Sequence, residues 1–252
     1  GRPTPVSALI HAATMVAAGV YMLCHSFWLF EDLRLTLTVI AWVGGLTAFF
    51  AAALALVESD LKRILAFSTL SQLGYMVMAV GLGGDVTAMY HLMTHAFFKA
   101  LLFLAAGSVI HGTHRQNIFE LGGLWKTMPW TSRVFLIGSL ALCGFPGLSG
   151  FFSKDEILIL ARERNLALYA IGIVTAGMTA FYITRCWWVA FMRKAVSPAA
   201  GGTSSPAGMV PARSPAHGLH PRESGPVMLA PLFFLAIFSV IAGYLGIPAF
   251  LG

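Results

Sequence analysis

Three ionisable residues recur at every fourth position of an otherwise apolar stretch: His91, His95 and Lys99. Residues four apart in an α-helix lie one turn above one another, so the sequence predicts one stripe of these side chains along a helix. The run from Asp85 to Ile110 has about 26 residues and would measure roughly 39 Å, enough to cross a bilayer with some tilt. Because a charge in mid-membrane costs about 2.5–3.5 kcal/mol, such residues face a bundle interior or water and mark an ion pathway. The chemistry that this stripe suggests is proton transfer.

The composition indicates which class of protein positions the stripe. The chain is 58% hydrophobic and only 10% charged, against roughly 25% charged in soluble domains. We therefore expect an all-α, polytopic transmembrane helix bundle of about seven spans. The net charge of +6 resides largely in loops, where it reports membrane orientation rather than nucleic-acid binding. The three cysteines lie far apart without a Cys-x-x-Cys motif, so we expect no disulfide framework, no metal site and no bound cofactor.

Apolar runs and loops predict the organisation of the chain. We expect a membrane domain over residues 1–193, with spans at about 3–27, 36–57, 61–82, 85–110, 131–162 and 166–190. A flexible cytoplasmic linker rich in Pro, Ala, Gly and Ser follows over residues 194–225, and a last span covers residues 226–252. Most Lys and Arg residues then fall on one side of the membrane, which places the start of the chain in the cytoplasm. Because residue 1 is not Met and no signal peptide is evident, we expect an internal fragment of a longer protein.

The span at 131–162 contains helix-breaking residues at membrane depth. They are Gly144, Pro146, Gly147 and Gly150. Their clustering predicts a discontinuous helix near residues 144–150. Irregular backbone is tolerated at this depth only beside protein or a water-filled cavity, and Lys154 and Asp155 follow directly. A broken helix next to charged residues is typical of transporters.

Three segments resemble motifs of a known family. They are TPVSALIHAATM at residues 4–15, HLMTHAFFKA at 91–100 and GFFSKDE at 150–156. All three are similar to the antiporter-like subunits of respiratory complex I (NADH-quinone oxidoreductase), above all those of the L type. The resemblance runs from end to end of the chain but corresponds only to the eighth to about the fourteenth helix of that subunit. It therefore describes a C-terminal-half fragment without the family's N-terminal half.

The resemblance implies a proton-translocating subunit that has no redox centre of its own and is driven by redox chemistry in other subunits. It assigns Lys99 as the central lysine, His91 and His95 as the histidines leading to it, His11 as a bridging histidine, and Lys154 with Asp155 as the terminal exchange pair. Histidine exchanges protons near neutral pH, and a buried lysine releases its proton more readily than an exposed one. The implied partners are the other membrane-arm subunits of complex I, the lipid bilayer, protons and water, without nucleic acid. The implied location is the bacterial inner (plasma) membrane.

Alternative interpretations exist for each signal. The chain could belong to the A subunit of an Mrp-type cation/proton antiporter, which would also carry Na⁺ or K⁺. It could instead be a membrane scaffold that uses the buried charges only to pack helices. His91 and His95 could be metal ligands, but zinc needs three or four ligands and Lys99 is a poor one. His11 could be a hydrogen-bonded core histidine, and Lys154 with Asp155 a structural ion pair.

Overall fold

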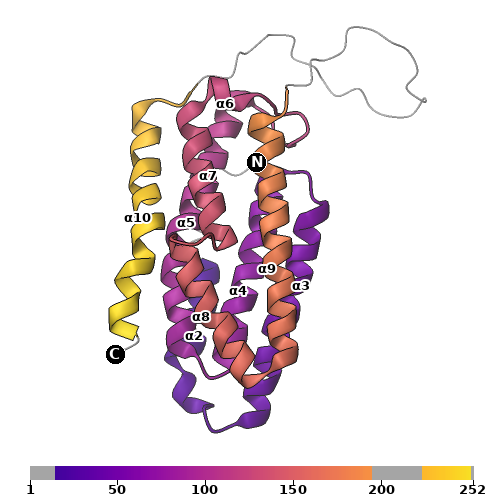
Figure 1. Cartoon of the computed structure of the whole chain (residues 1–252), viewed down its shortest axis with the longest axis vertical. Helices are drawn as coiled ribbons and strands as arrows, with labels where there is room; N and C mark the ends of the chain where they lie inside the picture. Colours follow the sequence, from indigo (N-terminus) through magenta and orange to yellow (C-terminus); the bar gives the residue numbers. More distant parts are fainter. Residues whose placement is uncertain (1–14, 195–222, 251–252) are drawn as a thin grey trace, which may run out of the picture.

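The computed structural model describes the backbone of residues 15–194 and 223–250 (Figure 1). His11 and most of the expected linker lie outside these residues. Within the described ranges the regular elements are helical, and the one β-bridge joins Asp60 to Asn117. The elements are α2 (Met15–His25), the 3₁₀ helix η2 (Phe27–Leu29), α3 (Arg34–Val57), α4 (Leu61–Gly81), α5 (Asp85–Thr113), α6 (Leu124–Thr127), α7 (Pro129–Cys143), α8 (Ser149–Arg164), α9 (Leu166–Trp187), the π-helical segment η3 (Trp188–Met192) and α10 (Pro226–Phe250).

Five of the described helices are long and apolar enough to cross a membrane: α3, α4, α5, α9 with η3, and α10. The shorter helices α7 and α8 stack end to end along the same direction (Figure 1). The prediction of an all-α transmembrane bundle with a discontinuous helix is thus confirmed. Several boundaries differ from the predicted spans by two or three residues. For example, α5 continues to Thr113, whose hydroxyl donates to Val109 O at 2.7 Å. His114 then ends the helix with a left-handed φ of 55°.

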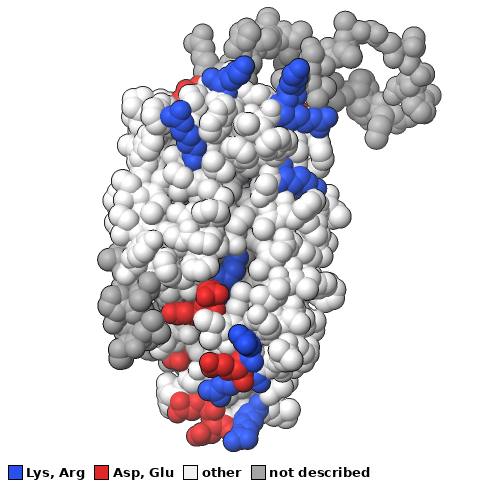
Figure 2. All heavy atoms as spheres, viewed as in Figure 1, with Lys and Arg blue, Asp and Glu red and all other residues white. Residues whose placement is uncertain are grey.

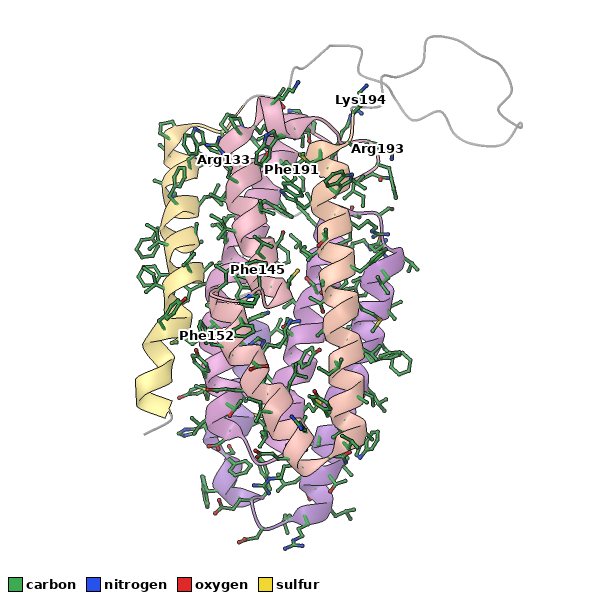
Figure 3. The ribbon with its side chains drawn as sticks, viewed as in Figure 1. Arg133, Phe145, Phe152, Phe191, Arg193 and Lys194 are labelled. Atoms are coloured by element: carbon green, nitrogen blue, oxygen red, sulfur yellow. The ribbon has the colours of Figure 1, made fainter. Side chains whose placement is uncertain are left out.

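The break between α7 and α8 follows from its glycines. Gly144 and Gly147 have φ values of +81° and +89°, a region that glycine enters without steric cost. Gly150 brings the two half-helices together, because a Cβ atom there would lie only 1.9 Å from the carbonyl oxygen of Ala141. Phe145 lies at the break and Phe152 on the first turns of α8 (Figure 3).

Helix α4 forms the centre of the bundle. Its most apolar stretch is 78% buried, compared with 28% for α10 at the periphery. Close packing of α3 against α4 depends on small residues: a Cβ atom on Gly44 would lie 2.3 Å from Met78 N, and one on Gly74 would lie 2.5 Å from Ala48 N. The polar residues of α4 are consequently held deep inside the protein, next to α5.

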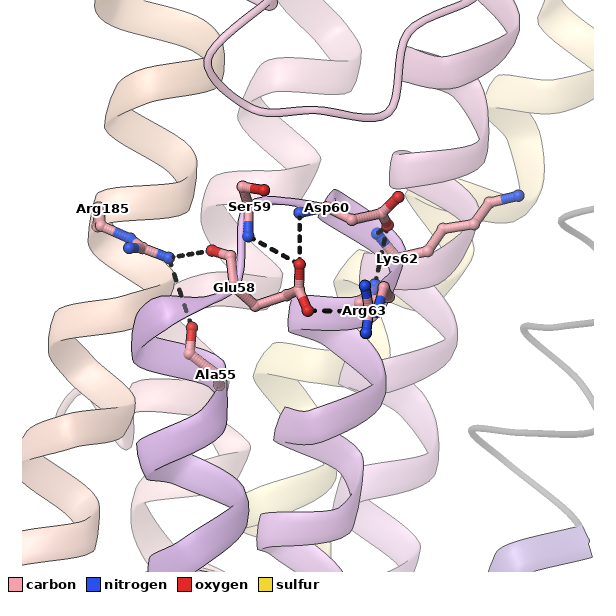
Figure 4. A network of polar contacts seen from close by, with 7 residues as sticks. All are labelled: Ala55, Glu58, Ser59, Asp60, Lys62, Arg63 and Arg185. Atoms are coloured by element: carbon pink, nitrogen blue, oxygen red, sulfur yellow. Dashed lines mark hydrogen bonds and ion pairs between the residues drawn. The ribbon is translucent and has the colours of Figure 1, made fainter. Parts of the chain in front are cut away.

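A polar network closes the end of the bundle where α3 meets α4 (Figure 4). Arg185 of α9 donates to the carbonyl oxygens of Leu56 and Glu58, both at 2.6 Å. The Glu58 carboxylate accepts hydrogen bonds from the backbone N–H groups of Ser59 and Asp60, and these bonds hold its pKa below the usual range. Glu58 also forms an ion pair with Arg63 at 3.2 Å. The network fixes the ends of three neighbouring helices.

Charged side chains gather at the two ends of the bundle (Figure 2). Arg133, Arg193 and Lys194 lie at the upper end (Figure 3). The lower end carries acidic and basic residues together, at the start of α3 and the end of α8. Most of the remaining surface in this view is uncharged, apart from a small charged group near mid-height.

Candidate functional site

The α5 stripe lies in the interior of the bundle. His91, His95 and Lys99 are each at most 1% exposed. The ring centroids of the two histidines are 6.2 Å apart, and Phe98 packs against both rings. The structure thus brings the three predicted residues together on one buried face, within a largely apolar setting.

Helix α4 supplies polar partners for the stripe. Gln72 Oε1 lies 3.1 Å from His91 Nε2, and Lys99 Nζ donates to Ser68 Oγ and to Leu65 O at 3.5 Å. An amide oxygen only accepts hydrogen bonds, so this contact is a hydrogen bond in the tautomer that carries its proton on His91 Nε2. Ser68 and Gln72 are four residues apart, the same spacing as in the stripe that they face. That repeat was the sequence signal that could have identified them as functional partners.

Helix α8 reaches the same histidine from another side. Ser153 Oγ lies 2.8 Å from His91 Nδ1 and 2.8 Å from Thr94 Oγ1. With the ring proton on Nε2, Nδ1 is an acceptor, and it shares the single Ser153 hydroxyl proton with Ser149 O, which lies 3.2 Å from Ser153 Oγ. His91 therefore joins α4, α5 and α8 through hydrogen bonds at both ring nitrogens. Sequence reasoning did not identify Ser153 or Thr94, since both look like ordinary helical hydroxyls.

Three buried polar atoms near the stripe have no hydrogen-bond partner among the described residues: His95 Nε2, Gln72 Nε2 and the Tyr182 hydroxyl. Leaving such an atom unpaired costs about 1–3 kcal/mol, and proteins commonly satisfy such groups with ordered water. His95 lies between His91 and Lys99 along α5. An unpaired nitrogen atom thus lies at the middle of the stripe.

The structure separates the side chains of Lys154 and Asp155. Lys154 is buried, and its ammonium group donates to Leu142 O at 2.8 Å and lies 5.6 Å from the centre of the Tyr75 ring. Leu142 belongs to the last turn of α7, whose carbonyl groups have no further helical partners because the helix ends at Cys143. Asp155 is exposed, and no ion pair joins it to Lys154 in the described part of the chain. Successive helical residues point about 100° apart, which explains the different environments.

Both buried lysines act on the same small region. Lys154 reaches it from α8 and Lys99 from α5, and both side chains are buried. Ser153, the neighbour of Lys154, contacts His91 directly. Within the described ranges, no three His, Cys, Asp or Glu side chains lie close enough together to hold a metal ion.

Comparison with known proteins gives the chain its relatives. Residues 1–180 match the family described as NADH:quinone oxidoreductase/Mrp antiporter, TM. The chain is 50% identical to NAD(P)H-quinone oxidoreductase chain 5 of Picosynechococcus sp., over 98% of its own length and 39% of the relative. It is 47% identical to the chloroplastic subunit 5 of Nephroselmis olivacea, over 98% of its length and 37% of that protein. The chain thus spans about two-fifths of the length of these relatives.

A solved structure has the same fold. The chain matches the Mrp complex from Dietzia sp. with a TM-score of 0.78 at 25% identity, over 92% of this chain and 49% of that one. A second match, the archaeal membrane-bound sulfane sulfur reductase, has a TM-score of 0.68 at 28% identity, over 81% of this chain and 32% of that one. The family match covers the α5 stripe, the break and Lys154. The chain belongs to the NADH:quinone oxidoreductase/Mrp antiporter transmembrane family.

Proposed function

We propose that this chain is part of a proton-translocating membrane subunit of an NAD(P)H-quinone oxidoreductase of the complex I type. The observation that carries the proposal is the buried polar series from Ser153 through His91 and His95 to Lys99 and Ser68. An apolar core would be cheaper than buried ionisable groups, because each such group costs free energy to bury. A role in proton transfer accounts for their presence.

The proposed pathway combines direct hydrogen bonds with one connection through a water molecule. His91 is linked directly to Ser153 and Gln72, and Lys99 directly to Ser68. His95 lies between these residues along α5, and a water molecule bound to its unpaired Nε2 would complete the connection. Histidine accepts and donates protons near neutral pH, and buried lysine changes its charge more readily than buried arginine. His95 would thus relay protons between His91 and Lys99.

Lys154 is proposed as the terminal group of this pathway. Lys99 and Lys154 are both buried, and two buried ammonium groups repel each other, so protonation of one lysine would favour proton release from the other. Asp155 is exposed on α8 and would exchange protons with the outside rather than pair directly with Lys154. His11 is proposed as a bridging residue on the resemblance of its motif alone.

The energy for transport would come from other subunits. Moving one charge through 100 mV requires roughly 2.3 kcal/mol, which redox chemistry elsewhere in a complex would supply. The partners proposed are the remaining membrane subunits of the oxidoreductase and the lipid bilayer. The basic upper end of the bundle would face the cytoplasm of a bacterial cell, with the connector after α9 on the same side.

An Mrp-type cation/proton antiporter is the second candidate. The likeness to the Mrp complex from Dietzia sp. supports it, because that fold covers 92% of the chain. The two candidates differ in whether NADH oxidation or a sodium gradient drives the protons. Measuring proton uptake by membrane vesicles with NADH, and separately with a Na⁺ gradient, distinguishes them.

Replacing Lys99 tests the proposal. Lys99→Met in the full-length, assembled complex should abolish most proton pumping while leaving complex assembly intact, because methionine has similar bulk but carries no proton. Lys99→Arg should also pump poorly, since arginine does not release its proton. Lys126→Met, at an exposed lysine on α6, is the matched control. Normal pumping by assembled Lys99→Met would refute the pathway and favour a scaffold.

A further inference from the structure

A pocket of about 570 Å³ lies at the lower end of the bundle, away from the α5 stripe. It is formed where the start of α3, the ends of α4 and α8 and the start of α9 come together. Its volume falls within the range of small-molecule sites, so it can hold a headgroup-sized ligand. Because three spanning helices begin or end here, the pocket lies at the boundary between the membrane and water.

Two arginines give the pocket its charge. The side chains of Arg34 and Arg164 line it, and neither forms an ion pair or a hydrogen bond with any residue that the structure describes. Glu31 also lines the pocket, so two positive charges and one negative charge leave a net +1. Guanidinium groups match phosphate oxygens in geometry as well as charge. A net charge of +1 complements a phosphodiester, which carries a single negative charge.

The rest of the pocket wall is apolar and leads toward the membrane interior. Leu37, Ala41 and Trp42 follow Arg34 along α3, and Leu168 faces them from α9. Trp42 lies roughly 12 Å farther along the helix axis than Arg34, toward the middle of the bundle. Val39 and Val43, on the neighbouring face of α3, are each more than half exposed. A ligand with an anionic head and a hydrocarbon tail fits both parts of this surface.

We propose that this pocket binds the phosphate headgroup of an anionic membrane phospholipid, with its acyl chain lying along α3. The phosphate would lie between Arg34 and Arg164, at the depth where headgroups occur in a bilayer. Asn165 Oδ1 accepts from the amides of Ala167 and Leu168, and its NH2 group can donate to a ligand. The two arginines supply the charged donors of the site. This binding site is independent of the proton pathway.

The test measures lipid retained by the full-length protein. The protein is reconstituted in nanodiscs of phosphatidylglycerol and phosphatidylcholine, extracted in mild detergent, and its bound lipids are counted by native mass spectrometry. Retention of phosphatidylglycerol over phosphatidylcholine is expected, with a roughly 5- to 30-fold weaker preference in the double variant Arg34→Gln/Arg164→Gln. Arg162→Gln is the matched control, since Arg162 is exposed on the same end but does not line the pocket.

Three results would overturn the proposal. Equal retention by the double variant would show that the arginines do not hold the lipid. An equal loss in Arg162→Gln would show that general surface charge is responsible. Displacement of phosphatidylglycerol by inorganic phosphate would identify a soluble-anion site instead. Thermal unfolding in phosphatidylcholine alone checks folding, and the double variant should match the wild type there because both arginines are exposed and unpaired among the described residues.

Discussion

Replacing Ser153 by alanine removes the hydroxyl that links α8 to His91. The Ser153 oxygen lies 2.8 Å from both His91 Nδ1 and Thr94 Oγ1. Thr94 keeps a bond to the His91 carbonyl oxygen at 3.1 Å, so the group left without this partner is His91 Nδ1. A buried unpaired acceptor costs about 1–3 kcal/mol. If this free-energy cost destabilises the hydrogen-bonded arrangement through which protons move, proton transfer slows by roughly 5- to 150-fold.

The assay compares proton pumping with NADH oxidation in proteoliposomes that contain the full-length assembled complex. Proton uptake per NADH oxidised should fall in Ser153→Ala within this range. Ser139→Ala is the control, because Ser139 is equally buried but bonds to Phe135 O one turn earlier in its own helix. Equal pumping by the two variants, at similar thermal stability, would refute the role of the link between Ser153 and His91.

Three further predictions concern packing, charge and the broken helix. Gly74→Val should lower the free energy of unfolding by at least about 1–3 kcal/mol, because a side chain there would collide with α3. Gly177→Ala, with open space around its Cβ position, should be neutral or stabilising. Similar unfolding midpoints of the two variants in detergent would contradict this prediction. The low pKa of Glu58 means that its contribution to stability is present at neutral pH and is lost as the pH falls below the usual carboxyl range. The stability difference between wild type and Glu58→Gln should therefore disappear in acid. A difference that is independent of pH would show that the charge of Glu58 does not stabilise the fold. Lys154→Met should impair pumping far more than Asp155→Asn, because only the lysine is buried against the end of α7; the reverse order in proteoliposomes would place the essential charge on Asp155.

Much of the fold could be read from local patterns. The four-residue spacing of His91, His95 and Lys99 predicted one helical stripe, and the structure has it buried on α5. The glycines near Pro146 predicted a break, which lies between Cys143 and Ser149. Both features depend on properties of a few consecutive residues, namely helical periodicity and the backbone freedom of glycine. The roles of the site residues in proton transfer stay predictions.

The partners of the stripe could not be identified in the same way. Ser68 and Gln72 belong to a different span from the stripe, yet they contact Lys99 and His91 directly. Ser153 carried no signal in its own neighbourhood. Each contact joins residues at least 19 positions apart in the chain, so it depends on which helices become neighbours.

The sequence by itself determined the membrane class, the order of the helices, the break and the positions of the buried charges, because hydropathy and spacing act along the chain. Only the tertiary structure decided that α4 and α8 flank the stripe, that Lys154 bonds to Leu142 O, and that Asp155 is exposed. It also created the pocket beside Arg34 and Arg164 from the ends of four helices, α3, α4, α8 and α9. Such arrangements depend on how closely helices pack. The close approach of α3 to α4 is possible because Gly44 and Gly74 have no side chains.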